Sequence, residues 1–282
     1  MSEAQGQQNT QEVSHESTLF AEPIAHFGSF TITNSLIMSW VTVVVLVTFF
    51  VAAGKKAKKN AKKAPRGIHN LFEIILEQAL NMADGVTGSR KKTAKLLPIV
   101  LSLFLFILVN NWLGLLPGVG TVGFVETGEH GKVFVPLLRG ATADLNTTLA
   151  LSLFAVVASH LLGVLTVGLW SHFNKFVNLK AFAQIFKKAR REPAIIMVNP
   201  IKIFVGFVEV ISEIAKVASL SLRLFGNIFA GEVLLASMMA IFAFFLPLPF
   251  MFLEIIVGIV QALVFAILTL AFMSIATTHE EH

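Results

Sequence analysis

Five long apolar stretches divide this 282-residue chain and leave few folds open to it. They cover about residues 36–53, 96–116, 145–170, 201–246 and 250–276. Each reaches the roughly 18 residues that a helix needs to cross the hydrocarbon core of a bilayer. Only 14% of the residues are charged, against roughly 25% in soluble proteins. These features predict an all-α polytopic membrane protein with about five spanning helices.

The remaining segments suggest a tail and one helix at the membrane surface. Residues 1–30 are expected to form a polar N-terminal tail on the outer side, and 31–282 a single membrane domain. The stretch 68–83 has apolar residues at helical spacing but no continuous apolar run. Such a pattern is typical of an amphipathic helix lying in the membrane interface.

The fourth apolar stretch is too long for a simple crossing. As one helix, its roughly 46 residues would measure about 69 Å, more than twice the roughly 30 Å hydrocarbon core. A helix of this length must be steeply tilted, bent or partly outside the bilayer. Pro247 and Pro249 end it, and the last stretch returns through the membrane, so we expect a long tilted hairpin.

Basic residues indicate the orientation. Of the 22 Lys and Arg residues, 18 lie in three clusters, at 55–66, 90–95 and 175–191, or at Lys202. By contrast, the loop after the second stretch has only Lys132 and Arg139. The positive-inside rule places the basic loops and the C-terminus inside and the N-terminus outside. The last two cations, Lys216 and Arg223, lie within the fourth stretch.

Polar residues within this stretch form a stripe. At about 100° per residue, several of them project within about 40° of Arg223, whereas Glu232 points about 180° away. The stripe consists of Glu209, Ser212, Lys216, Ser219 and Asn227. Charged groups in a membrane are expensive unless they are paired or reach water, so they suggest a function. Glu254 and Gln261 share one face of the last stretch, and Thr142, Asp144 and Asn146 begin the third.

Several of these residues have simpler interpretations. Ser102, Ser152 and Thr269 are expected to bond to carbonyls of their own helices. Glu209 and Lys216 could form an interfacial ion pair. Asp144 could stabilise a helix N-terminus instead of lining a channel, and His160 fits a packed polar side chain better than a proton relay.

Arg223 does not admit such an interpretation, because guanidinium keeps its proton and its charge at any depth. It can act as a fixed cation that favours the ionised form of a carboxylate approaching it. Glu232 and Glu254 can act as proton stations if water reaches them. The stripe offers no acidic partner at the depth of Arg223, so we expect that partner to belong to another chain.

The segment Ser219–Leu235, with its Arg-Leu-Phe-Gly-Asn and Ala-Gly-Glu runs, closely resembles subunit a of the F-type ATP synthase. The similarity extends from about residue 20 to the C-terminus. It includes Asn-Trp-Leu-Gly-Leu-Leu-Pro at 111–117, Ala-Asp-Leu-Asn-Thr-Thr at 143–148 and Gln-Ala-Leu-Val-Phe at 261–265.

The resemblance implies a proton-translocating stator subunit without a catalytic site or cofactor of its own. Arg223 would face the carboxylates of the rotor c-ring and keep two offset half-channels apart. The outer half-channel would comprise Asn227, Glu232, Glu254, Gln261, Thr142, Asp144 and Asn146, and the inner one Glu209, Ser212 and Lys216. The implied partners are the c-ring, the peripheral-stalk b subunits and the rest of the complex, in an energy-transducing membrane, the plasma (inner) membrane of a bacterium.

Three positions depart from some members of this family. Gly114 stands where some have an acidic residue, Glu254 where others have His, and Phe272 where some have Tyr. Glu232 and Glu254 could therefore share the channel entrance and titrate together. The coupling ion, proton or sodium, stays open.

Other function classes fit less well. A self-contained secondary transporter for protons or sodium would predict internal repeats, and the sequence shows none. The catalytic motifs of an intramembrane protease are absent, because the chain has no Cys, no His-Glu-x-x-His run and no Gly-x-Ser-x-Gly run. Nucleic-acid binding is not expected, since anionic lipid headgroups account for the basic clusters beside the spans.

Overall fold

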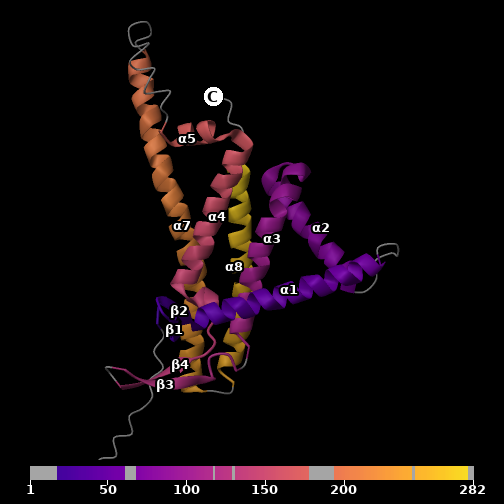
Figure 1. The fold of residues 1–282 in the computed structure, drawn as a ribbon, viewed down its shortest axis with the longest axis vertical. Helices are drawn as coiled ribbons and strands as arrows, with labels where there is room; N and C mark the ends of the chain where they lie inside the picture. Colours follow the sequence, from indigo (N-terminus) through magenta and orange to yellow (C-terminus); the bar gives the residue numbers. More distant parts are fainter. Residues whose placement is uncertain are drawn as a thin grey trace, which may run out of the picture.

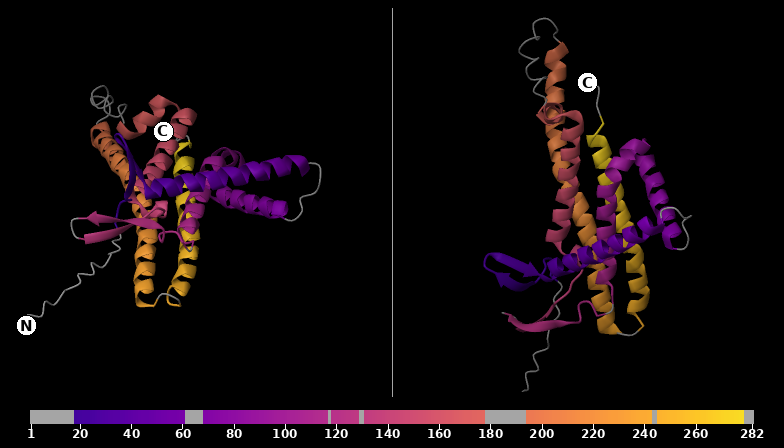
Figure 2. Two further views of the ribbon diagram at one scale, coloured as in Figure 1. Left: turned by 60° about the horizontal axis from the view of Figure 1, so that its bottom comes forward. Right: turned by 45° about the vertical axis from the view of Figure 1, so that its right-hand side comes forward.

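Four long helices stand side by side and form the body of the molecule (Figure 1). They are α3 (Arg90–Gly114), α4 (Leu145–Val167), α7 (Ala194–Ile241) and α8 (Pro247–Ala276). A further helix, α1 (Asn34–Asn60), runs across them (Figure 2). The computed structural model describes residues 18–60, 68–116, 118–128, 131–177, 194–242 and 245–278. In these ranges five helices are long and apolar enough to span a membrane, which confirms the predicted all-α polytopic fold.

Apolar side chains between the four upright helices make the core. One cluster joins Ala83, Leu96, Leu97, Val100, Ala266, Leu270 and Met273, and a second joins Leu103, Ile107, Ala155, Leu220, Leu224, Ala262 and Phe265. The outer faces are also apolar, with exposed Leu165, Phe204 and Phe252 among many others. An apolar exterior is stable against lipid tails, which are as apolar as leucine itself.

The helix ends depart from the predicted spans by up to seven residues. The first helix continues beyond Gly54 into the lysine-rich segment, because lysine is a good helix former. The third span ends at Val167 instead of 170. Gly168 follows it with φ 92°, a conformation that only glycine adopts freely, and turns the chain into α5 (Leu169–Val177). This short helix crosses the end of the bundle (Figure 1), hereafter the α5 end.

The over-long helix predicted at 201–246 is present as the 48-residue α7, which begins seven residues earlier and includes Pro200. It extends past α4 at the α5 end and turns into α8 at the opposite end (Figures 1 and 2). The amphipathic helix predicted at 68–83 is α2 (Ile68–Thr87). Its Ala83 packs against α3 and α8.

Two antiparallel hairpins occupy the opposite end of the bundle, hereafter the hairpin end (Figure 1). The first pairs β1 (Pro23–Phe27) with β2 (Phe30–Thr33); the second pairs β3 (Gly123–Gly128) with β4 (Gly131–Pro136). A 3-10 turn, η1 (Ala141–Ala143), then leads into α4. Residues 18–30, which were assigned to the polar tail, are instead folded against the membrane domain, while residues 1–17 of that tail lie outside the described residues.

Candidate functional site

Arg223 lies on a face of α7 that no other part of the described chain covers. Ser212, Ser219, Arg223 and Asn227 are all exposed, whereas the neighbouring Leu220 and Leu224 are buried in the core. The Arg223 guanidinium donates a hydrogen bond from Nη2 to Ser219 Oγ, 3.2 Å away. No described acidic residue forms an ion pair with it. A fixed cation thus faces outward from the middle of an apolar helix.

Gln261 of α8 reaches the base of this arginine. The two residues line one narrow crevice between α7 and α8, together with Leu220, Leu224 and Phe265. Gln261 Oε1 is buried and accepts no hydrogen bond from any described residue. The register of the α7–α8 hairpin, which the sequence left open, therefore places Gln261 and Arg223 at the same crevice.

Glu254 is buried further along α8, towards the hairpin end. Its side chain packs directly on Gly231 of α7, and a Cβ atom at that position would overlap the carboxyl group. Its Oε1 is enclosed and has no hydrogen-bond donor in the described structure. Glu254 is therefore a buried carboxyl group with spare acceptor capacity. It can occupy this position because Gly231 has no side chain.

Glu232 has quite different surroundings, because Arg139 binds it from the loop before α4. Arg139 Nε donates to Glu232 Oε1 at 3.1 Å, and Nη2 donates to Oε2 at 3.0 Å. The same guanidinium donates to the backbone oxygens of Thr18 and Phe20 at 2.8 and 3.2 Å. Arg139 is only 3% exposed, so the ion pair also anchors the N-terminal segment.

The role of Arg139 was not predicted from the sequence, where this residue is only a cation in a loop. No local pattern marks this residue, because its carboxylate partner is 93 positions away. The sequence offers one indirect signal: Arg139 is an isolated arginine between the apolar residues that precede it and the polar group Thr142–Asp144.

Asp144 and Thr142 tie several elements together at the hairpin end. Asp144 is the N-cap of α4 and accepts hydrogen bonds from the Asn146 backbone, Thr147 and Ser35, at 2.9 to 3.1 Å. The helix-terminal interpretation of Asp144 is thus confirmed. Thr142 donates to Asn111 Oδ1 at 2.6 Å, while Asn111 Nδ2 donates to Gly258 O at 3.2 Å. The Asn146 side chain is exposed.

On the part of α7 nearer the α5 end, Lys216 binds Glu213, with Nζ 2.6 Å from Oε1. It does not pair with Glu209, the partner considered from the sequence. The Lys216 ammonium also lies 5.0 Å from the centre of the Phe272 ring on α8, a cation–π arrangement. Glu209 is half-buried and Ser212 is exposed.

The three helix-bound hydroxyls behave as predicted. Ser102 donates to Pro98 O at 2.7 Å, Ser152 to Leu149 O at 3.0 Å and Thr269 to Phe265 O at 2.8 Å. Each of these hydroxyls therefore has its hydrogen-bond partner within its own helix.

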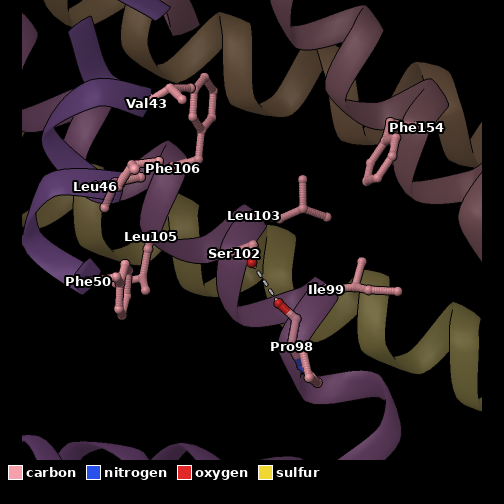
Figure 3. A pocket seen from close by; sticks show the side chains of 11 residues that line it. Val43, Leu46, Phe50, Pro98, Ile99, Ser102, Leu103, Leu105, Phe106 and Phe154 are labelled. Carbon is pink, nitrogen blue, oxygen red and sulfur yellow. Dashed lines mark hydrogen bonds between the residues drawn. The ribbon is translucent and has the colours of Figure 1, made fainter. Parts of the chain in front are cut away.

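A cavity of about 610 Å³ opens between α1 and α3, and Phe154 of α4 also lines it (Figure 3). Its lining is apolar except for Ser102, whose hydroxyl bonds to its own helix. No titratable side chain faces it, so this cavity suits a lipid chain or an apolar helix and not an ion path.

Comparisons with known proteins identify the family. The family model described as "ATP synthase A chain" matches residues 36–274. The subunit a of Syntrophobacter fumaroxidans ATP synthase is 31% identical over 92% of this chain and 90% of its own length. The subunit a of Mycobacterium tuberculosis is 33% identical over 85% of this chain and 84% of its own length. That of Campylobacter jejuni is 30% identical over 84% of this chain and 88% of its own length. The chain described here belongs to the ATP synthase subunit a family.

Proposed function

We propose that this chain is the stator side of a proton path that is completed by the rotor ring of an ATP synthase. The observation that carries the proposal is the exposed Arg223 guanidinium on an uncovered face of a membrane-spanning helix. An isolated cation against lipid is strongly unfavourable, so a carboxylate-bearing partner must cover this face in the working complex. The c-ring is the partner that fits.

The chemistry of the guanidinium explains how this face would couple ion flow to rotation. A carboxyl group of the rotor that moves next to Arg223 is driven to ionise, because the fixed positive charge stabilises its anion. The same charge repels free protons and keeps them from crossing directly. Each charge that moves through a potential of 100 mV releases about 2.3 kcal/mol, so several protons are needed for each ATP.

The outer half-channel would run from the hairpin end to Arg223. We assign the proton-carrying role to Glu254, because it combines burial with an unsatisfied oxygen, and assign Gln261 and Asn227 to the last step beside Arg223. Glu232, Thr142, Asp144 and Asn146 would shape this path, since Glu232 and Asp144 are already bound by several donors. The inner half-channel would begin at the α5 end, along Glu209, Ser212 and Lys216.

ATP-driven acidification of inverted membrane vesicles tests the proposal. Arg223→Ala should abolish pumping by the complete complex, while vesicles stripped of the catalytic head should still leak protons passively. Leu222→Ala is a matched control, because Leu222 is 58% exposed on the adjoining surface and carries no charge. Unchanged pumping by Arg223→Ala would refute the coupling role of Arg223. Loss in both variants would indicate a packing role for this face.

A further inference from the structure

Two histidines and a glutamate from three helices lie in a continuous polar contact at the α5 end. His160 of α4 places Nδ1 3.1 Å from Nε2 of His172 on α5. Its other ring nitrogen, Nε2, lies 3.3 Å from Oε2 of Glu213 on α7. The order His172, His160, Glu213 therefore connects the short surface helix to the long helix that carries Arg223.

The local backbone brings these groups together. Gly168 turns α5 back over α4, which places His172 beside the helical turn after His160. There, Gly163 provides the room, because a Cβ atom at this position would lie only 2.8 Å from His172 Cε1. Two glycines thus allow the imidazole pair to form, and the two rings meet edge to face with centres 5.3 Å apart.

The group is partly exposed and lies beside the proposed inner path. The side chains of His160 and Glu213 are 30% and 18% exposed. Lys216, which balances the charge of Glu213, is one helical turn closer to Arg223 and lies on the same stripe as Ser212 and Ser219. Glu209, one turn before Glu213 on α7, is a further charged residue in the described part of this region.

Neutral imidazole is suited to pass protons, because one ring nitrogen accepts while the other donates. We propose that His172, His160 and Glu213 form a proton relay at the mouth of the inner half-channel; this inference rests on the function proposed above. A proton taken up from water by His172 releases the Nε2 proton to His160 Nδ1. His160 then gives its own Nε2 proton to Glu213, and Glu213 passes it to water along the stripe. The reverse order delivers protons to the inner side.

The test uses the complete ATP synthase in inverted vesicles, with the amount of assembled complex measured for each variant. His160→Ala and His172→Ala should each slow ATP-driven acidification by about 100-fold, the lower end of what a positioned proton carrier contributes. Added imidazole, which reaches the exposed inner face of these vesicles, should restore much of the rate. His26→Ala is the matched control, because His26 is exposed on the first hairpin at the other end.

His160→Gln and His172→Gln decide the case if the alanine variants fail to assemble. Glutamine keeps hydrogen bonds but cannot relay a proton, so these variants should assemble and pump slowly. Normal pumping in the glutamine variants, or slow pumping that imidazole does not restore, would overturn the relay. Arg223→Ala, measured alongside, separates the two proposals. If the histidine variants pump at the normal rate while Arg223→Ala does not pump, only the relay is refuted.

Discussion

At the scale of single residues, Arg139 and Arg223 show one side chain in two opposite settings. Arg139 is buried, and each of its three guanidinium nitrogens donates to Glu232 or to the Thr18–Phe20 segment. Arg223 makes one hydrogen bond, to a serine of its own helix, and is exposed. A buried, satisfied guanidinium holds a structure together. An exposed guanidinium in a membrane span requires a partner from outside, which is why only Arg223 is assigned to coupling.

Removing Arg139 should destabilise the protein more than removing both members of its ion pair. Arg139→Met leaves Glu232 partly buried and unpaired, a change expected to cost about 3 kcal/mol. Adding Glu232→Leu should recover much of this loss, because the double variant no longer leaves the Glu232 carboxylate unpaired; Glu22, which is 4.0 Å from Arg139 Nη1, stays in both variants. The melting temperature of the purified chain in detergent measures both effects. Equal losses in the single and double variants would show that the backbone contacts of Arg139 matter more than its ion pair.

Gly231 offers a second test, because it determines where Glu254 lies. Gly231→Ala should push the Glu254 carboxyl group aside, lower the melting temperature and reduce proton pumping, since the new methyl group overlaps the carboxylate. Overpacking of this kind typically costs about 1 to 3 kcal/mol.

Two further variants isolate the steric cause. Gly85→Ala, in α2, meets no atom within 4 Å of the new Cβ and should keep or slightly raise stability. Gly231→Ala combined with Glu254→Ser should regain stability but not pumping, because the clash is removed together with the proposed proton carrier. A stability loss that persists in the double variant would contradict the proposed contact.

At the scale of helices and strands, the apolar stretches predicted the number and the centres of the spanning helices. The helix ends differ by up to seven residues, at the end of α1 and at the start of α7, and α3 begins six residues early. The apolar stretches succeed because length and hydropathy alone decide whether a helix crosses a bilayer. The two hairpins were not predicted, because their strands are only four to six residues long. The segment before β1 is held by distant residues such as Asp144, which accepts a hydrogen bond from the Ala21 backbone. The stripe around Arg223 could be predicted from helical periodicity. The Arg139–Glu232 pair and the approach of Gln261 could not, because they depend on how separate helices pack.

The turn between α4 and α5 should tolerate only glycine. Gly168 has φ 92° and ψ 148°, a region of the Ramachandran plot that is essentially closed to other residues. Gly168→Ala is expected to cost about 1 to 3 kcal/mol, seen as a lower melting temperature. Gly168→Asn should be no better, because asparagine favours the left-handed helical region, where ψ is near +47°. A milder effect of asparagine would show that the turn relaxes to that region.

At the scale of the whole molecule, the two ends differ in chemistry and imply an orientation. The α5 end carries Arg90, Lys91, Lys92 and Lys95 at the start of α3, as well as the end of α8. The hairpin end holds the β3–β4 hairpin and the buried Arg139. Because cytoplasmic loops are rich in exposed Lys and Arg, we expect the α5 end to face inside and the hairpin end outside.

Thiol labelling tests this orientation directly, because the chain contains no cysteine and each introduced thiol is the only one. Val122→Cys places a thiol at the hairpin end, where the native side chain is 63% exposed. Thr278→Cys places one at the α5 end, at an exposed position beside Lys92. A membrane-impermeant maleimide should label position 122 in intact cells or right-side-out vesicles and position 278 only in inverted vesicles. The opposite labelling pattern would reverse the orientation of both half-channels and move the histidine relay to the outer side. Labelling of both positions from the same side would contradict the conclusion that the helix bundle spans the membrane.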